Sequence, residues 1–135
     1  MSLLKAFQGQ LTSFLKESDT FAIGYHPDAD GMGAVAILIR YLLEQKKQRE
    51  NIFLYPTNAS SPMNRLLYPE QEADVLSKRP DFFLYVDLAN FIPDQIRRIK
   101  KKVRYTASID HHNFKPDWPD EFDLYINPTL FEGAV

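Results

Sequence analysis

Carboxylate and imidazole side chains concentrate in three short segments of the chain. The segments are YHPDADG, YVDLAN and SIDHHN, and their candidate ligands are His26, Asp28, Asp30, Asp87, Asp110, His111 and His112. Four carboxylates in one crevice would repel one another and raise their pKa values unless a cation offset their charge. Oxygen and imidazole ligands without sulfur suit Mn²⁺, with Mg²⁺, Co²⁺, Zn²⁺ or Fe²⁺ as alternatives. More than four candidate ligands indicate two ions, and paired divalent ions commonly act on phosphoryl groups.

Composition narrows the chemistry further. The 135 residues include no cysteine, which excludes a disulfide framework, a thiolate metal site and a cysteine nucleophile. The net charge of −2 creates no general attraction to nucleic acid or anionic lipid, so any such contact must be local. The chain has no signal-peptide hydrophobic region and no run of the roughly 20 apolar residues that a membrane span requires. We therefore predict a cytoplasmic globular protein without a membrane segment.

Five apolar bursts of strand length are rich in Phe, Tyr, Ile and Val. They lie at 21–26, 51–57, 81–89, 103–110 and 123–128. Most of them lack polar alternation, as expected for parallel strands that are covered on both faces. Apolar spacing and charged ends predict helices within the first 19 residues and at 32–48, 69–79 and 93–102. The remaining long segment, 55–67, is predicted to be a surface loop.

The alternation of strands and helices predicts one α/β domain, with a doubly wound, mostly parallel sheet and helices on both faces. Ligands of such sheets bind at the carboxyl ends of the strands, and every candidate ligand falls at the carboxyl end of a predicted strand. His26, Asp28 and Asp30 are spaced by two, so an extended backbone would direct them to one side. Gly31 and Gly33 would let the backbone approach a bound phosphate at the start of the next helix, where anions are favoured.

Each of these acids also has a structural explanation. Asp30 could cap the helix at 32–48, and Asp87 could open an Asx turn. His112 could be a packed or hydrogen-bonded histidine without a chemical role. Capping does not require adjacent histidines, however, and the joint occurrence of all these residues favours a shared metal site.

Four motifs occur in one order along most of the chain. They are HPDADG (26–31), VDLAN (86–90), IDHHN (109–113) and INP (126–128). In this set the chain resembles the DHH phosphoesterase superfamily, and in particular its RecJ-like and oligoribonuclease-like members. The resemblance implies a DHH domain with a Rossmann-like sheet. It also implies a manganese-dependent hydrolase of phosphodiester or phosphoanhydride bonds. In such a hydrolase the bound cations lower the pKa of a water molecule, which then attacks phosphorus.

The resemblance also implies a role for each candidate ligand. His26 and Asp28 would bind one metal ion, Asp30 and His111 would bind the other, and Asp87 would bridge the two.

Residues around these ligands would complete the implied site. Asp110 would support the ligands, and His112 would contact the substrate phosphate and assist catalysis. Together with His112, Gly31 and Gly33 make up the expected substrate-binding residues.

One part of the family pattern is missing. Relatives carry a further metal-binding aspartate well downstream of the DHH motif, followed by a separate substrate domain. Asp117, Asp120 and Asp123 lie too close to that motif to supply this ligand. We therefore expect residues 1–135 to be a single, C-terminally truncated DHH domain with an incomplete second metal position.

Three functions fit the sequence. The leading one is an exonuclease of the RecJ-like type, acting on single-stranded nucleic acid or short oligonucleotides, because of the form HPDADGMGA in the first motif. The alternatives are hydrolysis of a small substrate, such as a cyclic dinucleotide, a bisphosphate nucleotide or pyrophosphate, and a non-catalytic nucleotide-binding module. The basic stretch at 97–104 could follow a phosphate backbone, although a solvated helix end explains it better.

Overall fold

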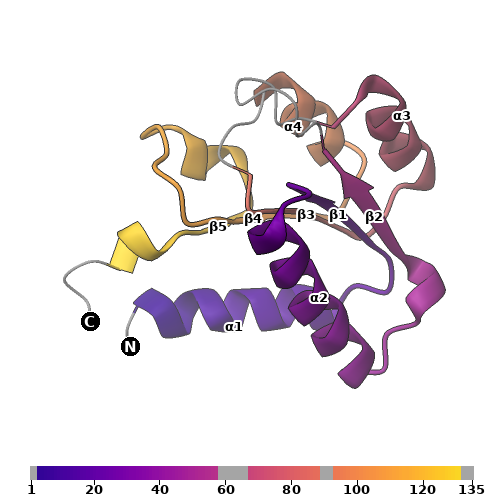
Figure 1. Cartoon of the computed structure of the whole chain (residues 1–135), viewed down its shortest axis with the longest axis horizontal. Coiled ribbons are helices and arrows are strands. Elements are labelled where there is room, and N and C mark those ends of the chain that lie inside the picture. Colours follow the sequence, from indigo (N-terminus) through magenta and orange to yellow (C-terminus); the bar gives the residue numbers. More distant parts are fainter. Residues whose placement is uncertain (1–2, 58–66, 89–92, 132–135) are drawn as a thin grey trace.

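A single sheet of five short strands lies at the centre of the computed structural model, which describes residues 3–57, 67–88 and 93–131 (Figure 1). The strands are β1 (Phe21–Tyr25), β2 (Ile52–Pro56), β3 (Phe82–Val86), β4 (Tyr105–Ile109) and β5 (Leu124–Ile126). Their order in the sheet is β2-β1-β3-β4-β5, and every neighbouring pair is parallel. The predicted doubly wound parallel sheet is therefore confirmed.

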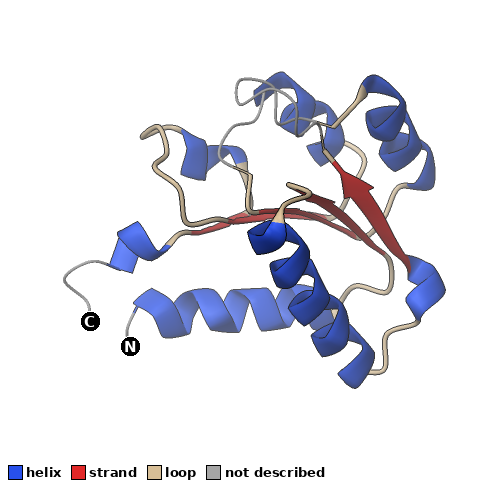
Figure 2. Cartoon of the chain, in the orientation of Figure 1, coloured by secondary structure: helices blue, strands red, loops and turns tan. Residues whose placement is uncertain are grey.

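Helices cover both faces of this sheet (Figures 1 and 2). They are α1 (Leu3–Lys16), α2 (Ala29–Glu44), α3 (Pro69–Lys78) and α4 (Pro93–Lys100), with short 3-10 helices η1 (Arg49–Asn51), η2 (Trp118–Glu121) and η3 (Pro128–Phe131). Figure 1 shows α1 and α2 on one side of the sheet and α3 and α4 on the other. No helix in the described residues is long and apolar enough to cross a membrane.

Strand β3 explains why the strand sequences are apolar throughout. Phe82, Leu84 and Val86 pack in the core on the side of α1 and α2. Phe83 and Tyr85 alternate with them and pack in the core on the side of α3 and α4. All five residues are buried, because successive side chains of a strand point to opposite faces and both faces are covered.

The boundaries of two elements differ from the prediction for identifiable reasons. Helix α2 begins at Ala29 instead of residue 32, because Asp28 caps it. It ends at Glu44 instead of residue 48, and Lys46 then adopts a left-handed conformation with φ 67° that an α-helix cannot continue through. Strand β3 ends at Val86 because Asp87 is also left-handed. Most of the predicted loop at 55–67 and the last two residues of VDLAN lie outside the described residues.

The order of the strands indicates where in the sheet a ligand would bind. Chain connections run outward from β1 to β2 and then in the opposite direction from β3 to β5, so the winding direction reverses between β1 and β3. Open α/β sheets bind ligands at such a switch point, outside the carboxyl ends of the strands. His26 follows β1 and Asp87 follows β3, which puts both at this point.

Candidate metal centre

The turn after β1 is tighter than an extended segment. Asp28 caps α2, and its Oδ1 accepts a hydrogen bond of 2.8 Å from the amide of Gly31. This hydrogen bond lowers the pKa of the Asp28 carboxyl, because it stabilises the charged form. Asp30 lies in the first helical turn. The predicted extended backbone from His26 to Asp30 is therefore wrong, and the cap is Asp28 instead of Asp30.

Gly31 and Gly33 play different parts in this turn. A Cβ atom on Gly31 would lie 1.8 Å from the carbonyl oxygen of His26, so only glycine fits there. Its amide already donates to Asp28, which leaves that amide no evident role toward a phosphate. Gly33 is exposed, and a Cβ atom there would meet nothing within 4 Å. Participation of these glycines in substrate binding stays a prediction.

The two glycines offer a matched pair of substitutions. Gly31→Ala is expected to lower the free energy of unfolding by about 3 kcal/mol or more, because the clash is with backbone. Gly33→Ala is expected to raise it by about 0.5–1 kcal/mol, because alanine loses less conformational freedom in a helix. Urea denaturation measures both. A destabilised Gly33→Ala protein, or an unaffected Gly31→Ala protein, would contradict this account.

Asp87 lies at the centre of the site with an unusual backbone. Its φ is 58°, in the left-handed region that non-glycine residues rarely adopt. Its amide donates to the carbonyl oxygen of Ile109, which extends the pairing of β3 with β4 by one residue. The residue is only 4% exposed. Burial raises the pKa of its carboxyl, and the nearby charge of Asp28 raises it further.

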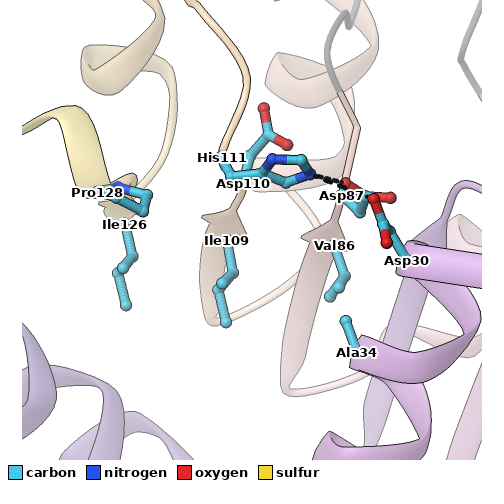
Figure 3. Close-up of a pocket in the computed structure, with 9 residues that line it drawn as sticks. All are labelled: Asp30, Ala34, Val86, Asp87, Ile109, Asp110, His111, Ile126 and Pro128. Carbon is cyan, nitrogen blue, oxygen red and sulfur yellow. Dashed lines mark hydrogen bonds and ion pairs between the residues drawn. The ribbon is translucent and has the colours of Figure 1, made fainter.

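His111 faces Asp87 and Asp30 from the end of β4 (Figure 3). Its Nε2 lies 2.8 Å from Oδ1 of Asp87 and 4.0 Å from Oδ2 of Asp30. Half of the His111 side chain is exposed, so the ring lies at the mouth of the site.

Asp110 and His112 form a hydrogen-bonded pair beside this cluster. Nδ1 of His112 lies 2.6 Å from Oδ1 of Asp110, whose side chain is fully buried. The same Nδ1 is 3.8 Å from Oδ1 of Asp87. The rings of His111 and His112 are 4.3 Å apart between centroids. Asp110 therefore orients His112, as supporting carboxylates commonly orient histidines.

The candidate ligands converge in two overlapping groups. One group comprises His26, Asp28 and Asp87, and the other comprises Asp87, Asp110, His111 and His112; within each group the ligand atoms lie within 4.8 Å of one another. Asp87 belongs to both groups. Asp30 belongs to neither, although its carboxylate is near His111.

Among the described residues, unpartnered buried atoms and the lack of protein cations both indicate that these groups are suited to bind cations. Nδ1 of His26 is 2.7 Å from Oδ2 of Asp28 but lacks hydrogen-bond geometry, so this buried nitrogen has no hydrogen-bond partner among the described residues. Oδ2 of Asp110 is likewise buried without a partner there. In addition, no ion pair found in the described residues joins a lysine or arginine to Asp28, Asp30, Asp87 or Asp110. Oxygen and imidazole donors without a protein cation are suited to divalent metal.

An open cavity adjoins the cluster. It has a volume of about 620 Å³, and Asp30, Asp87, Asp110 and His111 line it together with apolar side chains. Figure 3 shows the aliphatic side chains of Val86, Ile109 and Ile126 on one side of this polar group. The cavity is large enough for a molecule of nucleotide size to approach these four polar residues.

Sequence reasoning gave no role to Asn127 or to Thr57. Asn127 is fully buried after β5, and its Nδ2 donates to the carbonyl oxygen of His112 at 2.8 Å. Thr57 is buried after β2 and donates from its amide and its hydroxyl to the carbonyl oxygen of Tyr25. Their positions directly after strands were an available signal, since the carboxyl ends of all the strands meet at one edge, and Asn127 also lies in the INP motif.

The fold and the site together define a doubly wound α/β domain with an acid- and histidine-rich centre at its topological switch point. The chain matches the model of the DHH family, N-terminal domain, over residues 20–132, and it belongs to this family. The predicted relationship is thereby confirmed. A search of curated protein sequences found no match.

Two solved structures share the fold. One is RecJ from Thermus thermophilus in complex with Mn²⁺, with a TM-score of 0.66 and 20% sequence identity over 94% of this chain. The other is exonuclease RecJ bound to manganese, with a TM-score of 0.69 and 23% identity over 94% of this chain. The chain spans only 17% and 31%, respectively, of the lengths of these two proteins.

Proposed function

We propose that the chain carries the metal centre of a manganese-dependent phosphoesterase that hydrolyses phosphodiester bonds of single-stranded nucleic acid or short oligonucleotides. The observation that carries the proposal is the position of Asp87, which belongs to both groups of candidate ligands. The residue is buried, and burial raises the pKa of its carboxyl. Membership of the DHH family and the manganese in the two similar structures support it.

The proposed ligands divide between two ions. His26 and Asp28 would hold one, Asp30 and His111 the other, and Asp87 both. Divalent cations bound there would supply Lewis acidity, which activates water for attack on phosphorus and offsets the charge that develops on the phosphate.

His112 is the proposed residue for the substrate. Asp110 engages its Nδ1, so Nε2 is the ring nitrogen left to meet a phosphate oxygen. A third of the side chain is exposed. From this position the imidazole would donate a hydrogen bond to the phosphate or transfer a proton to the leaving group. Asp110 would hold the ring in the required orientation and tautomer.

The basic stretch at 97–104 bears on the choice between a nucleic-acid strand and a small phosphate substrate. The basic stretch at 97–104 is extensively ion-paired: Arg97 with Glu121, Arg98 with Glu72, Lys100 with Asp123 and Arg104 with Glu17. Residues 101–104 also precede β4, so they lie at the amino edge of the parallel sheet, away from the site. This stretch therefore lends no support to a nucleic-acid track.

A double charge reversal, Lys101→Glu with Lys102→Glu, tests that placement. We expect unchanged affinity for a single-stranded oligonucleotide and an unchanged dependence of affinity on salt, because both side chains lie at the edge opposite the site. The loss of two phosphate contacts would instead reduce the slope of log affinity against log salt by about 1.4. Fluorescence anisotropy over a salt series measures this slope.

A hydrolysis panel tests the proposal itself. The protein is incubated with Mn²⁺, or with EDTA as the control, and with a single-stranded oligonucleotide, a dinucleotide, a cyclic dinucleotide, a bisphosphate nucleotide and pyrophosphate. Mn²⁺-dependent cleavage of the first two supports the proposal. Cleavage of only the last three supports the small-substrate alternative. Nucleotide binding without any cleavage would identify a non-catalytic binding module.

A further inference from the structure

Asn127 has features that its position after a short edge strand does not require. The residue is fully buried, and a buried amide is costly unless hydrogen bonds satisfy it. Its Nδ2 donates to the carbonyl oxygen of His112 at 2.8 Å. The amide of Asp110 donates to the carbonyl oxygen of Ile126 at 3.0 Å, which carries the pairing of β4 with β5 to the residue before Asn127. Asn127 thus lies beside the first residues of the loop that leaves β4.

We infer that Asn127 is a positioning residue that fixes the imidazoles of His111 and His112 by holding the peptide between His112 and Asn113. The inference rests on the proposed metal centre. His112 is then held at two points, its ring by Asp110 and its backbone by Asn127.

Fixing this peptide also restrains His111. Residues 110–115 have no regular secondary structure, so helix or strand pairing does not set the direction of either ring. The His111 ring reaches Asp87 at 2.8 Å and lies against the His112 ring. Loss of the hydrogen bond from Asn127 would free the backbone at His112, and the contact between the two rings would pass that freedom on to His111. Partners of ligands that act in this way typically change metal affinity by about 10–100-fold when they are mutated.

The test uses Asn127→Leu, which keeps a similar volume and removes the donor. Thr106→Val is the matched control, because Thr106 is also fully buried, and its hydroxyl bonds Asp123 near the amino end of β4, away from the site. We expect Mn²⁺ affinity, measured by isothermal titration calorimetry, to fall about tenfold or more in Asn127→Leu and to stay unchanged in Thr106→Val.

A second readout needs no metal. Nitrogen-15 NMR of the histidine side chains in the metal-free protein reports the hydrogen bond between Nδ1 of His112 and Asp110. We expect this signal to shift or broaden in Asn127→Leu and to remain in Thr106→Val. If leucine prevents folding, Asn127→Ser, whose side chain is too short to reach the carbonyl, carries the same expectations.

Two results would separate the hypotheses. Wild-type affinity together with an unchanged His112 signal in the Asn127 variant would overturn the positioning role, whatever the loss of stability. No Mn²⁺ binding by the wild-type protein would overturn the proposed metal centre instead, and the NMR comparison would still decide the role of Asn127.

Discussion

Replacement of Asp87 by asparagine is expected to lower Mn²⁺-dependent hydrolysis by on the order of 10³-fold or more. The carboxylate belongs to both groups of candidate ligands, so its loss would weaken both ions together. Metal ions contribute several kcal/mol of transition-state stabilisation, and each 1.36 kcal/mol corresponds to about a factor of ten in rate. The measurement is the initial rate of oligonucleotide cleavage at saturating Mn²⁺.

Asparagine is the informative substitution because of the backbone at this position. Asp87 has φ 58°, and asparagine tolerates the left-handed region far better than alanine. Asp81→Asn is a matched control, since Asp81 lies just before the other end of β3 and accepts amide hydrogen bonds from Asp19 and Thr20. We expect Asp81→Asn to retain full activity. Activity above a tenth of the wild-type rate in Asp87→Asn would refute the shared-ligand assignment.

Mn²⁺ is expected to raise the melting temperature of the wild-type protein substantially. A ligand that binds only the folded state stabilises it by about 2.7 kcal/mol at a concentration of 100 times Kd. For a domain of this size that corresponds to a rise of about 10 °C. Thermal unfolding followed by circular dichroism at increasing Mn²⁺ concentration measures this shift. Its absence at millimolar Mn²⁺ would count strongly against the proposed site.

Thermal unfolding without metal is expected to show that Asp87→Asn is more stable than the wild-type protein near pH 7. Burial raises the pKa of the Asp87 carboxyl in the folded protein. The protonated carboxyl therefore contributes stability that is fully present below the unfolded pKa and is lost as pH rises through the folded pKa. Asparagine is neutral at every pH. We expect the difference in melting temperature between metal-free Asp87→Asn and metal-free wild type to shrink toward pH 4. We also expect Mn²⁺ to change the melting temperature of Asp87→Asn little.

Some of the site could be predicted from the sequence because of how parallel sheets are built. Buried parallel strands appear as continuous apolar runs, and each run was found within a few residues of its true bounds. The carboxyl ends of parallel strands share one edge, so Asp87 and His111 could be placed near each other before any geometry was known. That reasoning needs only the order of elements.

Other features were not predicted, and two of the three depend on contacts between distant segments. Spacing by two implied a common direction for Asp28 and Asp30, but capping by Asp28 turned the backbone into a helix within one residue. Asp87, with its left-handed backbone, donates its amide hydrogen bond to the carbonyl oxygen of Ile109, which lies on another strand. The role inferred for Asn127 depends on a carbonyl 15 positions earlier in the chain. Neither the contact of Asp87 with Ile109 nor that of Asn127 with His112 can be recognised from the residues beside it in the sequence.

The placement of the ligands on β1, β3 and β4 has a consequence for how the protein acquires its site. These three strands are neighbours in the sheet. In the sequence, however, β2 lies between β1 and β3, and it pairs with the outer side of β1. The group of His26, Asp28 and Asp87 therefore draws on two strands that β2 separates in the chain, and pairings of that kind form late because loop closure must precede them. An early intermediate containing only β1, α2 and β2 would hold His26 and Asp28 but lack Asp87. The proposed capacity to bind two ions would thus arise only once β3 has paired with both β1 and β4 in the sheet.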